Sequence, residues 1–184
     1  MKIVILGAGA VGSTLASLLS QENDLVVVDH NSSELHRLEE EADIKTLLGE
    51  ASYPNILVNA GIQEADMVVA VTGSDETNIV SCMIAKVLNK SIKTIARVRE
   101  ISYLKGKIKE AMDSGEIPVD IHISPEQLIT EHIQGLIEIP GSLQVMEFGQ
   151  GKLNLVAVRA VEGGPMIGHE IGDLKKHMPK IDSR

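Results

Sequence analysis

Short apolar runs alternate with longer amphipathic stretches through the first 138 residues of the chain. Nearly continuous apolar character over about five residues is typical of strands buried on both faces, as parallel strands between helix layers are. The predicted strands span residues 2–6, 25–29, 44–48, 67–71, 94–98 and 119–123, and the predicted helices span about 11–21, 32–42, 53–60, 75–89, 101–113 and 125–138.

This regular alternation predicts an α/β fold: a Rossmann-like, doubly wound parallel sheet of about six strands with right-handed crossovers. Local signals agree with the predicted helix ends. Ser74 and Ser124 stand where N-caps are expected, and Pro125 follows at the first helical position. Gly61 and Gly115 stand where helices are expected to end.

The pattern changes after residue 138. Two β-rich stretches, 143–148 and 153–161, flank Gly149-Gln150-Gly151, which is typical of a β-hairpin. Residues 139–184 are too few for a domain that folds alone. We therefore expect one complete domain over residues 1–138 and the incomplete, β-containing start of a second domain over residues 139–184.

Composition narrows the classes of function. The 184 residues include 17 basic and 26 acidic ones, a formal charge of −9, with 2% aromatics and one cysteine. An acidic chain with few aromatic rings is poorly suited to nucleic-acid backbones or bases, so no nucleic-acid partner is expected. No apolar run approaches the roughly 20 residues of a bilayer span, and no secretion signal opens the chain. These features predict a cytoplasmic protein without direct membrane insertion.

The first predicted strand leads into a glycine-rich turn, Gly7-Ala8-Gly9-Ala10-Val11-Gly12, and then into a predicted helix. In a GxGxxG turn of this kind, the first glycine permits the turn and the second lets the backbone approach a pyrophosphate. The third lets the helix pack on the strand, and the helix N-terminus attracts the phosphates. The turn therefore predicts nucleotide binding, with a purely structural turn as the alternative.

Asp29 ends the second predicted strand, 22 residues after Gly7. This matches the spacing of roughly 20 residues for the carboxylate that binds the adenosine ribose. A carboxylate repels a 2′-phosphate, and His30-Asn31-Ser32-Ser33 contains no basic side chain to accept one. The pattern favours NAD(H), or an adenine nucleotide with free ribose hydroxyls, over NADP(H). The alternative is that Asp29 only caps the next helix.

The fourth predicted strand ends at Val71-Thr72-Gly73-Ser74, and ligands of doubly wound sheets bind at the carboxyl ends of the strands. Thr72 and Gly73 are therefore expected to contact the nucleotide, while Ser74 is expected to cap the following helix.

Two arginines stand at the end of the fifth predicted strand. Arg97 and Arg99 are both placed to reach a phosphate or the nicotinamide side of a dinucleotide. A salt bridge to Glu100 or Asp75 is the alternative for either one.

Other reactive side chains fit structural roles. Cys82 lies at helical spacing with Ile79 and Met83 and is predicted to belong to the core. The six histidines show no metal-ligand spacing, so no metal site is expected. No residue is expected to be catalytic. Three alternating lysines, Lys105, Lys107 and Lys109, are expected to face solvent.

Several segments together carry a resemblance to a known family: MKIVILGAGAVGSTLA (1–16), VVVDHN (26–31), LLGEASYPNIL (47–57), GIQEADMVVAVTGSDETNIVSCMIAK (61–86), IARVRE (95–100) and VDIHISPEQLITEHI (119–133). Over essentially its whole length the chain resembles the TrkA-type regulatory subunits of bacterial Trk/Ktr potassium uptake, whose nucleotide-binding domain is called RCK or KTN. The block ADMVVAVTGSDETN is specific, because generic dehydrogenases do not carry it at that position. The segments 164–168 and 171–174 are similar to the start of the RCK C-terminal domain.

The resemblance implies a cytosolic regulatory subunit, not an enzyme. Such a subunit forms a dimer or a ring of dimers beneath a potassium-translocating membrane subunit, and nucleotide binding changes the shape of the assembly. By match it implies ligand contacts by Gly7, Gly9, Gly12, Asp29, Thr72, Gly73 and Arg97; Ala8, Ala10, Val11 and His30, which lie beside them, complete the candidate site.

Two positions depart from the family pattern. Many members carry an acid where this chain has Asn31, and some ATP-responsive members carry an arginine where it has Ala10. The second departure makes NAD(H) the favoured ligand, with ATP or ADP as the alternative.

A different class of function stays open at this point: an NAD-dependent oxidoreductase fragment without its substrate domain. An oxidoreductase needs a positioned acid or base beside the nicotinamide. Residues 139–184 are too few to enclose such a site, so the sequence favours a regulatory binding module.

The last predicted helix of the first domain carries an apolar stripe on one side. Its members are Leu128, Ile129, Ile133, Leu136 and Ile137. Because no further sheet strand follows, part of this stripe is expected to be exposed and to pair two copies of the chain. The alternative is that the stripe packs on its own sheet or on the hairpin.

Overall fold

The computed structural model describes residues 1–41, 43–148, 152–163 and 167–168 of the chain. By their internal contacts the residues form two compact units, Met1–Pro125 and Glu126–Arg184. The sequence places a domain boundary after residue 138, whereas the helix that precedes this residue belongs by its contacts to the second unit.

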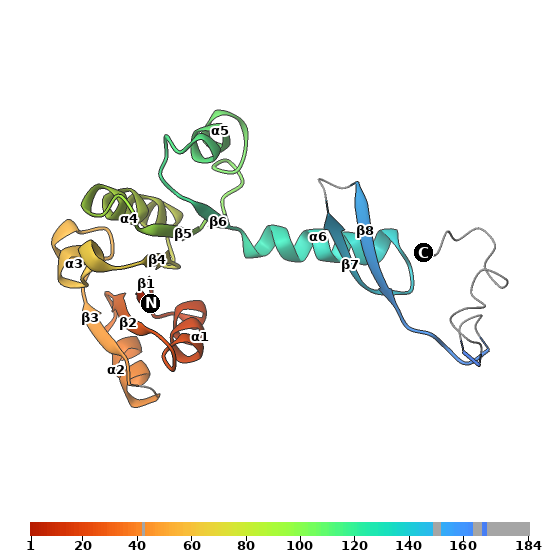
Figure 1. The fold of residues 1–184 in the computed structure, drawn as a ribbon, viewed down its shortest axis with the longest axis horizontal. Helices are drawn as coiled ribbons and strands as arrows, with labels where there is room; N and C mark the ends of the chain where they lie inside the picture. The colour runs from red at the N-terminus through yellow and green to blue at the C-terminus, as the bar shows by residue number, and fades with distance from the viewer. Residues whose placement is uncertain (42, 149–151, 164–166, 169–184) are drawn as a thin grey trace. The chain divides into compact units, whose positions relative to one another are not determined.

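The first unit is built on a six-stranded parallel sheet (Figure 1). The strand order is β3-β2-β1-β4-β5-β6, the doubly wound Rossmann order, and it confirms the predicted fold class. The order reverses between β1 and β4, where a ligand crevice is expected. The strands are β1 (Lys2–Leu6), β2 (Asp24–Asp29), β3 (Lys45–Leu48), β4 (Met67–Ala70), β5 (Lys93–Arg97) and β6 (Ile121–Ile123).

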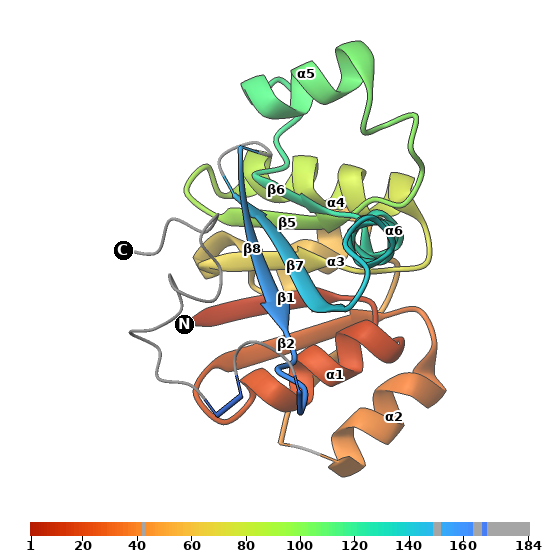
Figure 2. The ribbon, with the colours of Figure 1, turned by 90° about the vertical axis from the view of Figure 1, so that its right-hand side faces the viewer.

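Helices cover both faces of this sheet. Figure 2 shows α1 and α2 beside β2, and α4 beside β5, in agreement with the contacts between these elements. The helices are α1 (Ala10–Leu19), α2 (Ser32–Glu41), α3 (Pro54–Asn59), α4 (Asp75–Leu88) and α5 (Gly106–Ser114), with a 3-10 turn η1 at Ile62–Glu64.

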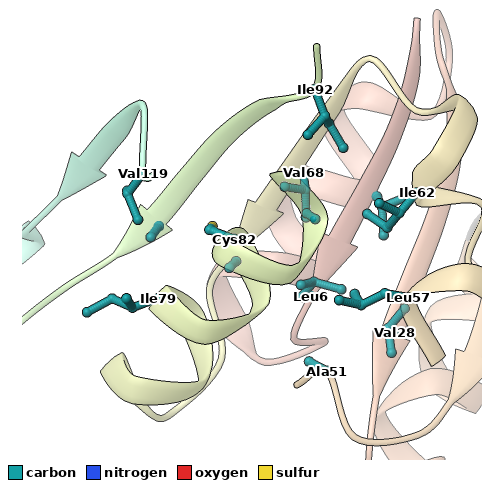
Figure 3. Close-up of a cluster of buried hydrophobic side chains, with 14 of the residues drawn as sticks. Leu6, Val28, Ala51, Leu57, Ile62, Val68, Ile79, Cys82, Ile92 and Val119 are labelled. Atoms are coloured by element: carbon teal, nitrogen blue, oxygen red, sulfur yellow. The ribbon is translucent and has the colours of Figure 1, made fainter. Parts of the chain in front are cut away.

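Two apolar clusters form because neighbouring residues of a strand point to opposite faces. Ile3 and Ile5 of β1 pack with side chains of α1 and α2. The other cluster, drawn in Figure 3, contains Leu6 and Val68 with side chains of α3, α4 and α5. Cys82 lies in this second cluster, fully buried as predicted, and burial raises the pKa of its thiol to about 12.

Two elements start at least two residues later than the sequence predicts. The predicted helix 101–113 is observed as α5, Gly106–Ser114, because a turn closes first: the N–H of Tyr103 donates to the carbonyl of Glu100. The predicted strand 119–123 is shortened to β6, because the N–H of Asp120 donates to the Thr94 hydroxyl instead of joining the ladder.

The second unit consists of helix α6 and an antiparallel hairpin. Its elements are α6 (Pro125–Glu138), β7 (Ser142–Phe148) and β8 (Leu153–Val158), and the pairing of β7 with β8 matches the predicted hairpin. The predicted turn at 149–151 and the segments 164–166 and 171–174 lie outside the described residues. Among the helices of the described part, none is long and apolar enough to cross a bilayer.

Candidate functional site

The glycine turn places the end of β1 tightly against the end of β4. Gly7 has a positive φ of 108°, and its N–H donates to the carbonyl of Val28 at 2.8 Å. A Cβ at this position would lie 3.0 Å from backbone atoms of Val71 and Thr72. Glycine is therefore required both by the dihedral angle and by the close approach of the two strands.

Asp29 joins the ends of β1 and β2 through its carboxylate. Oδ2 accepts a hydrogen bond from the N–H of Ala8 at 2.6 Å, and Oδ1 accepts one from the N–H of Asn31 at 2.8 Å. His30 Nδ1 lies 3.2 Å from the same Oδ1. The start of α2 is instead capped by Asn31, whose Oδ1 accepts from the N–H of Ser33 at 3.0 Å. Asp29 therefore holds the glycine turn through the N–H of Ala8, whereas the capping of α2 falls to Asn31.

A cavity of about 270 Å³ lies at the carboxyl ends of the strands, next to this carboxylate. It brings together five residues that the sequence predicts: Gly7, Asp29, His30, Thr72 and Gly73. The further lining residues are Val28, Gly49, Glu50, Ala51, Ser74 and Thr77. Its place beside the reversal of strand order is the usual ligand crevice of a doubly wound sheet.

The predictions missed the cavity wall that follows β3. Gly49, Glu50 and Ala51 line the cavity, and the N–H of Gly49 donates to the carbonyl of Asp29 at 2.9 Å. The signal was available, because these residues directly follow the third predicted strand and so belong to the carboxyl edge of the sheet.

The remaining predicted turn residues lie at the start of α1 and do not line the cavity. Gly9, Ala10 and Val11 are exposed, whereas Ala8 and Gly12 are buried. The N–H groups of the first turn of a helix have no partner within the helix and can bind an anion. The N–H of Ser13 does have a partner of this kind, since it donates to the carbonyl of Gly9 at 2.9 Å.

A buried amide organises the ends of β4 and β5. Asn78 of α4 is fully buried, and its Oδ1 accepts from the N–H of Thr72 at 2.9 Å and from its hydroxyl at 2.7 Å. Its Nδ2 donates to the carbonyl of Arg97 at 2.9 Å. The sequence did not reveal this role, because an Asn within a helix carries no signal of its tertiary partners. Ser74 caps α4 as predicted, since its Oγ accepts from the N–H of Thr77 at 3.1 Å.

The two candidate arginines have different partners. Arg97 donates from Nη2 to the carbonyl of Thr72 at 2.9 Å, and its Nε is buried without a hydrogen-bond partner. No acidic side chain of the described residues forms a salt bridge with it. Arg99 instead pairs with Asp75, with Nε 3.3 Å from Oδ1, which is the alternative interpretation for this residue.

Potential metal ligands do not cluster in the described part of the chain. No group of three or more His, Cys, Asp or Glu side chains there could hold a metal ion. His169 and His177 lie outside the described residues.

Comparison with known proteins places these features in a family. The TrkA-N domain matches residues 3–125. The chain is 49% identical over 185 aligned positions to the "Trk system potassium uptake protein TrkA" of Halomonas elongata, and 47% identical to the protein of the same name from Vibrio alginolyticus. Both alignments cover 100% of this chain but 40% of the relative, so the chain spans less than half the length of these relatives.

Solved structures share the fold. The TrkA-N domain of the Escherichia coli inner membrane protein ybaL superposes with a TM-score of 0.63 at 21% identity, covering 74% of this chain and 96% of that domain. A GsuK channel bound to NAD gives a TM-score of 0.59 at 22% identity over 78% of this chain and 27% of that one. GsuK bound to ADP gives 0.57 at 23% identity, over 74% and 33% respectively.

Proposed function

The chain belongs to the TrkA-N domain family, and from this premise we propose that it binds an adenine nucleotide, with NAD(H) favoured over ATP or ADP, as a regulatory module. The observation that carries the proposal is the cavity of about 270 Å³ in which Asp29, the first glycine of the turn, Gly7, and residues 72–73 meet. This arrangement suits an adenosine whose ribose hydroxyls donate to Asp29 and whose phosphates extend toward α1.

Charge supports the same proposal. The Arg97 guanidinium lacks an acidic partner among the described residues, and its Nε is buried without a hydrogen bond. A partly buried cation without a counter-charge is costly, and an anionic ligand beside it would offset that cost. Arg97 bonds to Thr72, which lines the cavity, so a phosphate of the ligand is the fitting anion.

The first test replaces the proposed ribose-binding carboxylate. Asp29→Ala is expected to weaken NADH binding by about 1–3 kcal/mol, because a charged hydrogen-bond acceptor of the ribose is lost. Isothermal titration calorimetry with NADH, NAD, ATP and ADP measures this change and identifies the preferred ligand.

The matched control is Asp24→Ala, at the opposite end of the same strand β2. The dissociation constant of NADH from this variant should equal that from the unmodified chain. Equal affinities of Asp29→Ala and Asp24→Ala would contradict the assignment of the ribose site. Steady oxidation of NADH with small keto acids by the unmodified chain would contradict the regulatory role and favour an oxidoreductase.

We further propose that the whole protein gates a potassium-translocating membrane subunit from the cytoplasmic side. The support is that the two relatives described above are named potassium uptake proteins. A gating role needs a nucleotide that prefers one conformation over another.

The apolar stripe of α6 supports a proposed homodimer. No residue of this helix is buried, and Leu128, Ile129, Ile133 and Ile137 are each at least half exposed. The hairpin adds exposed apolar side chains, among them Leu143, Phe148, Leu153 and Leu155. Exposed apolar side chains in this number mark a protein interface, and the same face of a second copy is the simplest partner.

Replacing Ile133 and Ile137 together by Asp is expected to give a folded monomer that still binds nucleotide. Two charges in the buried centre of an interface would prevent association, while the cavity of the first unit is unchanged. Sedimentation velocity measures the assembly at tens of micromolar. This is roughly the concentration at which a standard-size interface is occupied.

Gln134→Asp is the control for added charge, since it changes a polar position of the same helix that bonds to Glu138. It should remain a dimer. An unmodified chain that already sediments as a monomer would refute the proposed homodimer.

A further inference from the structure

A buried carboxylate joins the two loops that follow β4 and β5. Asp75, the first residue of α4, is 5% exposed and does not line the cavity. Its Oδ2 accepts the N–H groups of Arg99 and Glu100, both at 2.7 Å, and its Oδ1 lies 3.3 Å from Arg99 Nε. Asp75 therefore fixes both the backbone and the side chain at the start of the loop after β5.

Arg99 extends this link to the cavity. Its Nη2 donates to the carbonyl of Gly73, which lines the cavity and is exposed. The flanking residues have other partners, since Asn78 and Arg97 bond to Thr72, and Ser74 caps α4. Gly73 lacks a side chain, and a glycine has the widest choice of backbone conformations. Its carbonyl is held from the neighbouring loop.

We propose that Asp75 is a positioning residue of the nucleotide site, which through Arg99 holds residues 72–74 in the shape that lines the cavity before the ligand arrives. This inference rests on the proposed nucleotide-binding function. A loop already held in its bound shape loses less conformational entropy on binding, so the link raises affinity without touching the ligand.

The charge of Asp75 is part of the link. Burial acts to raise the pKa of its carboxyl, but the N–H groups of Glu100 and Arg99 and the Arg99 guanidinium lower the pKa below its usual value. The side chain is therefore an anion at neutral pH, and it can hold the guanidinium that holds Gly73.

The link between Asp75 and the cavity also predicts that a bound ligand affects the bonds of Asp75. If the shape of residues 72–74 depends on Asp75, then a ligand that stabilises this shape also stabilises the bonds from Asp75 to the loop after β5. Bound nucleotide should slow hydrogen exchange at the amides of Arg99 and Glu100. A carboxylate that only stabilised the fold would not give this response.

The experiment compares four forms of the full chain: unmodified, Asp75→Ala, Arg99→Gln and Asp120→Ala. Asp120 is the matched control, a carboxylate that accepts the N–H of Thr94 at 2.7 Å and pairs with Lys86 at 3.0 Å. It braces the starts of β5 and β6, at the other end of the strands from the cavity. Calorimetry gives the Kd for ADP and for NADH, and mass spectrometry follows hydrogen exchange with and without ADP.

Asp75→Ala and Arg99→Gln are expected to raise Kd about three- to tenfold and to remove the ADP-dependent protection of the segment around residues 99–100. Asp120→Ala should lower the melting temperature but keep the Kd. Arg99→Gln leaves the bonds from Asp75 to the backbone in place. If Asp75→Ala does not fold, the Kd of Arg99→Gln therefore tests whether the link through Arg99 positions residues 72–74.

Two failures are distinguishable. If the unmodified chain binds neither ADP nor NADH, the proposed function fails and the positioning role falls with it. If the unmodified chain binds but the Asp75 and Arg99 variants keep its Kd and its protection, then Asp75 is only structural, and the positioning role alone is overturned.

Discussion

Gly9→Val is expected to abolish nucleotide binding while the protein stays folded. A Cβ at Gly9 would meet no atom of the chain within 4 Å, and its φ of −65° and ψ of −174° suit any residue. The open space is where the phosphates are proposed to approach the backbone at the start of α1, and valine would fill it. We expect a loss of affinity of at least about 100-fold, or about 3 kcal/mol.

Calorimetry measures this loss, and thermal unfolding provides the structural control. Exchange of a glycine for valine at the N-cap of α1 should destabilise the fold by about 1 kcal/mol or less. A Gly9→Val protein that binds NADH and ADP normally would show that the glycine-rich segment is only a tight turn.

Gly12→Ala is expected to have the opposite profile, with a severe loss of stability. Its Cβ would lie 1.8 Å from the carbonyl oxygen of Gly7, a backbone atom that cannot move without displacing β1. Helix α1 would have to shift away from the sheet and from the cluster that contains Ile5 and Ala16. Overpacking of this kind costs about 1–3 kcal/mol and occasionally more, and we expect at least the upper value.

Urea unfolding of Gly12→Ala measures the change in the free energy of unfolding. Gly9→Ala is the matched control, since it adds the same methyl group to the same turn where space is open. Equal unfolding midpoints for the two variants would contradict the close packing of α1 on β1.

Much of the fold was predictable because its signals are local. Residues 3–6 of β1 and 67–70 of β4 are continuous apolar runs, and the glycines that end helices adopt positive φ angles, 80° at Gly61 and 82° at Gly115. The doubly wound class of the sheet followed from the number of alternating elements and the known handedness of crossovers. In the same way, the glycine turn and Asp29 could be placed at one edge of the sheet from their spacing alone.

The contacts that shape the site were harder to predict, because they join residues far apart in the chain. Asn78 is a polar residue of a helix, and the sequence gives no sign that it bonds to Thr72 and Arg97. For Asp75 the sequence offered an ion pair with either arginine, but not the bonds from the N–H groups of Arg99 and Glu100. The choice of Arg99 over Arg97 as the partner of Asp75 depends on backbone geometry at the end of β5. The cavity wall at Gly49, Glu50 and Ala51 depends on β3 lying beside β2.

The central place of β1 in the sheet has a consequence for how the protein is made. Ile3 pairs with Leu25 on one side and with Met67 on the other, so one edge of β1 lacks its partner until β4 has been translated. At about 5–20 residues per second, several seconds separate the synthesis of the two strands. During that interval the nascent chain presents an apolar strand with an open edge, which is a template for pairing with other chains. Expression at lower temperature or with added chaperone should therefore raise the soluble yield more than a change of buffer after lysis.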